Sequence, residues 1–245
     1  MAEGESRLGR ERRVAAFFDV DKTILSENSG ALYFRFLYER GELDWRSMLG
    51  QVASYVRYKL NLLDLERWTR ATMRAFAGQS ERELALEAGA WFHEWVLPTV
   101  YPEAVERVRD HLARGHVVSL VTGSTRFVVH PLARFLGVEH MLYTHLEVED
   151  GRFTGRIVEP VCMGEGKIYW LQQLIERESI DLAKSFFYTD SITDLPLLNL
   201  VGHPHVVNPD PLLYREARRR RWPVSLFQDP TPAAAPEGEA PRPAS

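Results

Sequence analysis

Two aspartates, Asp19 and Asp21, stand directly after a run of five apolar residues near the start of the chain, residues 14–18. A short apolar run bounded by polar residues is typical of a buried parallel strand, and ligands of open α/β sheets bind beyond the carboxyl ends of such strands. Of two carboxylates placed there, one can attack an electrophile as a covalent nucleophile while the other moves protons. The motif alone is weak evidence, since acidic pairs at strand ends also cap turns or stay solvated.

A second acidic pair, Asp190 and Asp194, follows another apolar run, residues 185–189. Four carboxylates that converge on one place repel one another and raise one another's pKa, so such a site needs a divalent cation and a nearby lysine. Hard oxygen ligands favour Mg²⁺, which binds one or two carboxylates together with substrate phosphate oxygens. The two acidic pairs therefore predict a magnesium site for phosphate chemistry.

Groups that suit a phosphate occur at two further places. Thr122 and Gly123 follow a third apolar run, residues 117–121, and are expected at the start of the next helix. A helix N-terminus attracts anions through its exposed N–H groups, and glycine lets the backbone approach closely. Lys167 is expected to open the helix that precedes the Asp190 strand, where its flexible point charge suits a phosphate.

The elements that must position these side chains follow from the same patterns. The three apolar runs predict three buried strands of a parallel sheet, with the polar residues at its carboxyl edge. Residues 145–148 and 152–158 flank Glu149-Asp150-Gly151, and because Asp-Gly is a strong turn signal they predict a β-hairpin.

Four stretches of the chain resemble, in order, the four motifs of the haloacid dehalogenase superfamily of phosphotransferases: Asp19-x-Asp21-x-Thr23, Thr122, Lys167 and Asp190-x-x-x-Asp194. The similarity extends from residue 14 to about residue 210. Four motifs in order, each after a strand or at a helix start, are far more specific than any one of them. The resemblance implies an α/β fold, with a Rossmann-like core built on a parallel sheet.

The resemblance also implies a role for each aspartate. Asp19 would be the nucleophile that forms an aspartyl-phosphate, and Asp21 would protonate the leaving oxygen and then activate the water that hydrolyses the intermediate. Mg²⁺ would be held by the carboxylates of Asp19 and Asp190 with the backbone carbonyl of Asp21. Asp194 would orient these groups or join the metal through water.

Substrate contacts follow from the same comparison. The transferring phosphoryl group would be bound by Thr23, Thr122, Gly123 and Lys167. In phosphoserine phosphatases a glutamate shortly after the first motif and an arginine of the cap typically read the substrate's amino and carboxylate groups. Asn28 stands at the matching position here, and Arg70 is the expected arginine. Thr193, in the fourth motif, is a further candidate contact where phosphoserine phosphatases usually carry glycine or asparagine.

The domain organisation is expected to combine a core with a cap. Apolar residues recur at helical spacing from 28 to 98, with breaks near Gly41, Asn61 and Gly78, which predicts a helical cap. Its place after the first strand resembles subfamily IB, the phosphoserine-phosphatase-like branch, which includes bacterial histidinol-phosphate phosphatases. The core would then comprise residues 14–27 and 99–228. Residues 1–13 and 229–245, rich in charged residues or in Pro, Ala and Glu, are expected to be flexible tails.

Composition limits the class of protein. The 245 residues are 45% hydrophobic, which is ample for a core, and the net charge of −4 gives no nucleic-acid signature. The single cysteine, Cys162, cannot form an intrachain disulfide and is expected to serve packing in a reducing compartment. Without a signal peptide or an apolar stretch near the roughly 20 residues of a membrane span, the protein is expected to be cytoplasmic, with no integral membrane segment.

The sequence thus predicts an Mg²⁺-dependent phosphomonoester hydrolase that acts on a small phosphorylated metabolite. Phosphoserine and histidinol phosphate are the candidate substrates. Two alternatives stay open: a phosphotransferase that passes the phosphoryl group to an alcohol with the same residues, and a regulatory phosphate-binding protein in which the acids are idle.

Overall fold

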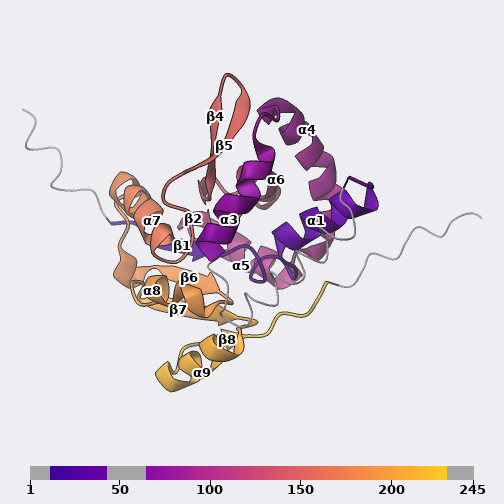
Figure 1. Ribbon diagram of the computed structural model, residues 1–245. Coiled ribbons are helices and arrows are strands. Elements are labelled where there is room, and N and C mark those ends of the chain that lie inside the picture. The colour runs from indigo at the N-terminus through magenta and orange to yellow at the C-terminus, as the bar shows by residue number, and fades with distance from the viewer. Residues whose placement is uncertain (1–11, 43–64, 231–245) are drawn as a thin grey trace, which may run out of the picture.

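The fold is built on a parallel sheet. The computed structural model describes residues 12–42 and 65–230, and the remainder of the expected cap and tails, residues 1–11, 43–64 and 231–245, lies outside the described residues. Six strands pair in the order β3-β2-β1-β6-β7-β8, each pair parallel (Figure 1). Their bounds are β1 Ala15–Phe18, β2 Val117–Val121, β3 His140–Leu142, β6 Phe186–Thr189, β7 His203–Val207 and β8 Val224–Ser225. The predicted α/β fold with a parallel sheet is confirmed.

Strand β1 lies in the middle of the sheet between β2 and β6, and all its residues are buried. Such a strand is apolar throughout because helices cover both faces of a parallel sheet. The register pairs Phe18 with Leu120 of β2 and with Tyr188 of β6, so these three strands end together. The residues that follow them in sequence therefore meet at one edge of the sheet.

Helices pack on both faces of the sheet. One apolar cluster contains Phe18 with residues of α5 (Pro102–Ala113) and α6 (Arg126–Leu136). The opposite cluster contains Phe17 with residues of α7 (Glu165–Glu178), α8 (Leu195–Leu198) and α9 (Pro211–Arg220). Cys162 is a free, buried thiol in this second cluster, as its expected packing role requires. Among the described helices, none is long and apolar enough to cross a membrane.

The regular elements described between β1 and α5 are all helical. It contains α1 (Ser29–Glu39), α3 (Leu65–Met73), α4 (Glu81–Trp91), a π-helix η2 (Phe92–Val96) and the 3-10 turns η1 (Arg74–Phe76) and η3 (Leu97–Thr99). Gly41 and Gly78 follow α1 and η1 with positive φ of 72° and 81°, where the sequence predicts breaks. The two crossings to the core run side by side, since Ser26 N donates to Thr99 O at 2.7 Å. The division into a core and a cap of residues 28–98 stays a prediction.

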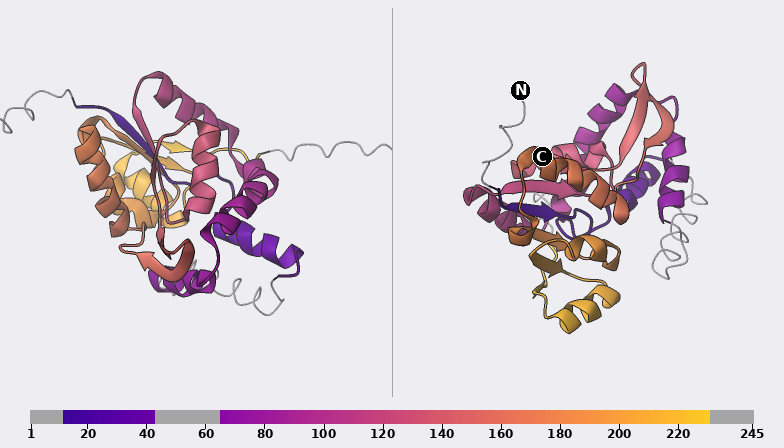
Figure 2. Two further views of the ribbon diagram at one scale, coloured as in Figure 1. Left: turned by 90° about the horizontal axis from the view of Figure 1, so that it is seen from above. Right: turned by 90° about the vertical axis from the view of Figure 1, so that its left-hand side faces the viewer.

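The predicted hairpin is formed by β4 (His145–Glu149) and β5 (Arg152–Val158). Asp150 and Gly151 both have positive φ, 50° and 74°, as a tight turn between twisted antiparallel strands requires. The hairpin packs on the inserted helical segment, which is the chain between β1 and α5. Gly78 N in that segment donates to Phe153 O at 2.8 Å, and Phe153 N donates to Gln79 O at 3.0 Å. Figure 2 shows it rising beside α3 and α4.

Candidate active site

A buried lysine lies between two aspartates at the carboxyl edge of the sheet. Lys167 Nζ, in the first turn of α7, donates to Asp19 Oδ1 at 2.9 Å and to Asp194 Oδ2 at 2.7 Å. Asp19 directly follows β1, and Asp194 ends the short 3-10 turn η5 (Ile192–Asp194). Asp19 lies 148 positions from Lys167 in the sequence, and Asp194 lies 27 positions from it, yet the three side chains meet in an ion triad. Each of the three residues is at most 8% exposed.

Asp194 is held from a second side. Its Oδ2 also accepts a hydrogen bond of 2.7 Å from Thr189 Oγ1, at the end of β6. One carboxylate oxygen thus receives both the ammonium and a hydroxyl. This arrangement fixes the position of Lys167 relative to the sheet.

The electrostatics of the cluster favour a further positive charge. Burial raises the pKa of Asp19 to about 7; Lys167 lowers it, and the charges of Asp194 and Asp21 raise it. Burial, followed by the charges of Asp19 and Asp194, raises the pKa of Asp190. Burial opposes the charge of Lys167, but the two neighbouring carboxylates raise its pKa above the usual value. One ammonium therefore does not balance the carboxylates gathered here.

The donor set fits Mg²⁺. The expected ligands, the carboxylates of Asp19 and Asp190 and the backbone carbonyl of Asp21, are all hard oxygens. Burial is the main cause that raises the pKa of Asp19 and of Asp190, and the neighbouring carboxylates raise both further. A divalent cation would favour the charged form of both groups. Within residues 12–42 and 65–230 no three side chains of His, Cys, Asp or Glu form a metal cluster. A cation at this site would thus complete its shell with the carbonyl, water and substrate oxygens.

Asp21 is bound by the first turn of α1. Its Oδ2 accepts from Asn28 Nδ2 and its Oδ1 from Ser29 N, each at 3.0 Å. Burial raises the pKa of Asp21, and the hydrogen bonds from Ser29 partly offset that effect. Asn28, expected to read the substrate, is therefore directed at Asp21 in this structure.

Two of the expected phosphate-binding residues, Thr122 and Gly123, lie in the loop after β2. Thr122 is buried, and its Oγ1 accepts from Ser124 N at 3.1 Å. The sequence places this loop at a helix start, but α6 begins only at Arg126, because Thr125 is extended (φ −96°, ψ 172°). Thr23 Oγ1 is buried without a hydrogen-bond partner among the described residues. A buried hydroxyl in that state is suited to a ligand oxygen or a water molecule.

The side chain of Met163 packs against Gly123. A Cβ added at Gly123 would come within 2.7 Å of Met163 Cγ and would also clash with Met163 Cε. Met163 Sδ in turn lies 4.0 Å from Thr69 Oγ1 of α3. The thioether thus fills the space between the loop after β2 and the inserted helical segment.

Two expected substrate residues are directed elsewhere. The guanidinium of Arg70 pairs with the carboxylate of Glu159 through hydrogen bonds of 2.8 and 3.2 Å. The Thr193 hydroxyl lies 2.9 Å from Ser191 Oγ, and Thr193 is exposed. The structure therefore brings Asp19, Lys167 and Asp194 into one network, with Asp190 coupled to them by charge, but directs Arg70 and Thr193 at other partners.

Some residues of the site were not identified from the sequence. Ser29 and Ser124 join α1 to the loop after β2 through a hydroxyl pair at 2.6 Å, and Thr189 supports Asp194. Their positions beside Asn28, Gly123 and Asp190 are the sequence signal that could have identified them.

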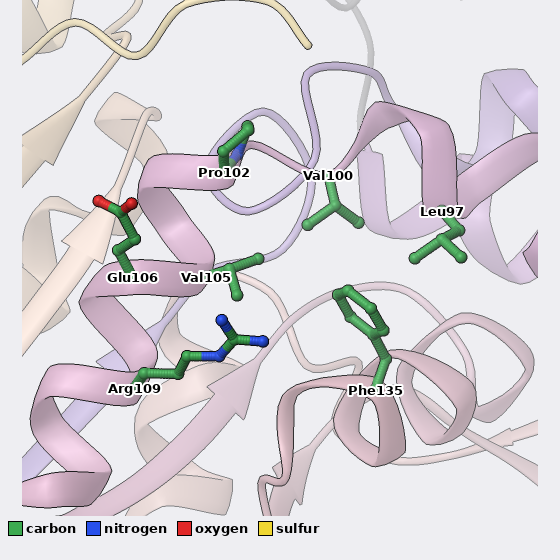
Figure 3. A pocket seen from close by; sticks show the side chains of 7 residues that line it. All are labelled: Leu97, Val100, Pro102, Val105, Glu106, Arg109 and Phe135. Atoms are coloured by element: carbon green, nitrogen blue, oxygen red, sulfur yellow. The ribbon is translucent and has the colours of Figure 1, made fainter. Parts of the chain in front are cut away.

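A separate hollow lies between η3, α5 and α6 (Figure 3). Its volume is about 450 Å³, and it is lined by Leu97, Val100, Pro102, Val105, Glu106, Arg109 and Phe135. None of these residues is among those expected to bind phosphate or metal.

The sequence is similar to phosphatases. A probable phosphatase of Mycobacterium tuberculosis is 36% identical over 221 residues, covering 89% of this chain and 77% of the relative. A histidinol-phosphatase of Neisseria meningitidis is 31% identical over 218 residues, covering 87% of this chain and 98% of the relative.

The fold is similar to that of several solved structures. A Bordetella pertussis protein of unknown function superposes with a TM-score of 0.79 at 33% identity, covering 88% of this chain and 99% of that one. A phospho-aspartyl intermediate analogue of phosphoserine phosphatase superposes with a TM-score of 0.64 at 18% identity, covering 89% and 95%, which shows a shared fold. The family model of haloacid dehalogenase-like hydrolases matches residues 16–199. With motifs, fold and relatives in agreement, the chain belongs to the haloacid dehalogenase-like hydrolase family.

Proposed function

We propose that this protein is an Mg²⁺-dependent phosphomonoester hydrolase that acts on a small phosphorylated metabolite through an aspartyl-phosphate at Asp19. The observation that carries the proposal is the buried Lys167 held between Asp19 and Asp194 at the carboxyl edge of the sheet. Phosphoryl transfer asks a protein mainly for in-line positioning and charge neutralisation, which this arrangement suits.

The proposed reaction has two steps. In the first, a carboxylate oxygen of Asp19 bonds to phosphorus while the bond to the leaving oxygen breaks, and Asp21 gives that oxygen a proton. In the second, Asp21 takes a proton from a water molecule that attacks the aspartyl-phosphate and releases inorganic phosphate. Lys167 stabilises the charge of the phosphoryl oxygens in both steps, with Asp194 and Thr189 holding it in place.

The metal would be held by the carboxylates of Asp19 and Asp190 and the backbone carbonyl of Asp21. When bound, Mg²⁺ neutralises charge on the transferring phosphoryl group. Thr122 would donate to a phosphoryl oxygen, and so would the hydroxyl of Thr23, which has no partner among the described residues. The remaining expected contacts, Gly123, Asn28, Arg70 and Thr193, stay predictions.

Phosphoserine and histidinol phosphate are the proposed substrates to test first. The Neisseria relative is named a histidinol-phosphatase, and its length is covered almost completely by this chain. The fold shared with phosphoserine phosphatase supports the second candidate at the level of architecture alone.

The test measures inorganic phosphate released from a panel of phosphorylated metabolites, with and without Mg²⁺. Asp19→Asn is expected to reduce release to background, because the amide is a far weaker nucleophile. Asp150→Asn, an exposed change of the same size at the hairpin turn, is the matched control and is expected to keep full activity. Release that persists in Asp19→Asn, or that is independent of metal, would reject the proposal.

A further inference from the structure

Both oxygens of the Asp21 carboxylate are occupied by one helix end. Oδ2 accepts from Asn28 Nδ2 and Oδ1 from Ser29 N, each at 3.0 Å, and both donors belong to the start of α1. A carboxylate that accepts on both oxygens is fixed in rotation as well as in position. The proton-transfer group of the proposed reaction therefore takes its orientation from α1.

The Asn28 amide is itself fixed by the helix. Its Oδ1 accepts from Ala31 N at 3.0 Å, so Asn28 is the N-cap of α1. Turning the amide over would place Nδ2 against the N–H of Ala31, donor against donor. The cap bond thus determines which end of the amide faces Asp21. Gly30 leaves room for this arrangement, since a Cβ there would lie 3.2 Å from Asn28 Oδ1.

Asn28 stands where the inserted helical segment leaves the core. The chain before it pairs with the returning chain, with Ser26 N donating to Thr99 O at 2.7 Å and Tyr101 N to Ile24 O at 2.9 Å. A change in the direction of α1 at this crossing moves the donor that holds Asp21. The position of the helical segment and the orientation of Asp21 are in this way mechanically linked.

We propose that Asn28 is a positioning residue that orients the Asp21 carboxyl from the N-cap of α1, rather than a contact to the substrate. The proposal rests on the proposed function, in which Asp21 protonates the leaving oxygen. A misplaced acid slows departure of poor leaving groups, which need the proton, more than departure of good ones, which leave without it.

Two variants separate capping from positioning. Asn28→Ser keeps a capping hydroxyl that is too short to reach Asp21. Asn28→Asp keeps the length and the capping oxygen but replaces the donor by a carboxylate oxygen that repels Asp21. Asparagine, aspartate and serine are about equally good N-caps, so α1 is expected to begin at the same residue in all three proteins. Ser80→Ala, which removes the N-cap of α4, is the matched control for a weakened helix start away from Asp21.

The experiment measures kcat/KM for a series of aryl and alkyl phosphates of increasing leaving-group pKa in the presence of Mg²⁺. For both Asn28 variants we expect a loss of about 10- to 100-fold with alkyl phosphates, a part of the ~10²–10⁴-fold that general acid–base catalysis contributes. The loss with 4-nitrophenyl phosphate is expected to be several-fold smaller, so the slope against leaving-group pKa becomes steeper. Ser80→Ala is expected to keep the wild-type slope.

Each other outcome overturns the inference. A wild-type slope with unchanged rates would mean that Asn28 only caps α1. A wild-type slope over this series, with a loss confined to one metabolite of the panel used to test the proposed function, would make Asn28 a substrate contact. Failure of the proposed function is a different result: the wild type would then release no phosphate, or Asp19→Asn would keep its activity.

Discussion

At the scale of single residues, Lys167 is buried between two carboxylates and is central to the proposed chemistry. Burying charges costs free energy that their attraction roughly offsets, so an intact buried ion pair adds little net stability. Removing one partner is different, because the remaining charges stay buried without compensation. Lys167 holds two carboxylates at once, so its loss leaves both Asp19 and Asp194 unpaired.

Lys167→Met is therefore expected to lower the free energy of unfolding by about 3–5 kcal/mol as well as to abolish phosphate release. Denaturant unfolding at pH 7 measures the first effect. Lys184→Met is the control, because the side chain of Lys184 is 70% exposed and its Nζ lies 3.7 Å from Asp181 Oδ2. Its removal is expected to cost less than about 1 kcal/mol. A similar small cost for both variants would contradict the stabilising role of the triad.

The meeting of these residues was predictable, whereas their exact partners were not. Asp19, Lys167 and Asp194 were expected at one site because each follows a strand or opens a helix in a recognisable order. The contact of Asn28 with Asp21 and that of Arg70 with Glu159 were not expected. Side-chain pairing depends on rotamers and on the packing of distant segments, which no local pattern encodes.

At the scale of elements, the contact of Gly123 with Met163 connects the loop after β2 to the chain that enters α7. Gly123→Ala is expected to cost about 1–3 kcal/mol of unfolding free energy, because the new methyl overlaps the Met163 side chain. In a Met163→Ala background the same change is expected to cost at least about 1 kcal/mol less, since the space is then open. Denaturant unfolding of the four proteins measures this coupling.

A matched glycine provides the control for backbone effects. Gly89 lies inside α4 with no atom within 4 Å of an added Cβ, so Gly89→Ala is expected to be stabilising by about 0.5–1 kcal/mol. Equal costs of Gly123→Ala with and without Met163 would show that this glycine is required for its backbone alone. That result would favour its expected role in close approach to a phosphate.

The elements themselves followed closely from the sequence. Strand β2 and the Asp-Gly hairpin lie where periodicity and turn chemistry placed them. Thr122 and Gly123 were expected at the start of the next helix but precede α6, because Ser124 O accepts from Thr144 N at 3.0 Å and Thr125 is extended. That hydrogen bond joins segments 20 residues apart in sequence, which is beyond the reach of local capping signals.

At the scale of the whole molecule, the parallel sheet was predictable but its order was not. The alternation of Phe17 and Phe18 between two apolar clusters follows from the strand period of two. The order of β3 to β8 and the packing of the hairpin on Gly78 and Gln79 depend on contacts between distant segments. The packing of α5 on the sheet also buries a histidine, His111.

His111 of α5 is 2% exposed, and its Nε2 lies 2.9 Å from Tyr188 Oη and its Nδ1 2.8 Å from His116 Nδ1. Burial, with the charge of His116, lowers the pKa of His111 to about 4. In the unfolded chain a histidine has a pKa near 6.5, so between these values the unfolded state binds the extra proton. This contribution to stability is complete above about pH 6.5 and is lost as the pH falls towards 4.

We expect the free energy of unfolding to fall by about 2 kcal/mol on this account between pH 7 and pH 5, at a slope near 1.4 kcal/mol per pH unit below pH 6.5. His111→Gln keeps a polar group for Tyr188 but does not titrate, so the difference between the two pH values should shrink by about that amount. His93→Gln, at an exposed histidine, should leave the difference unchanged. Denaturant unfolding at both pH values measures all three proteins. If wild type and His111→Gln lose stability equally, the acid sensitivity arises elsewhere, and His205, whose pKa burial also lowers to about 4, becomes the next group to substitute.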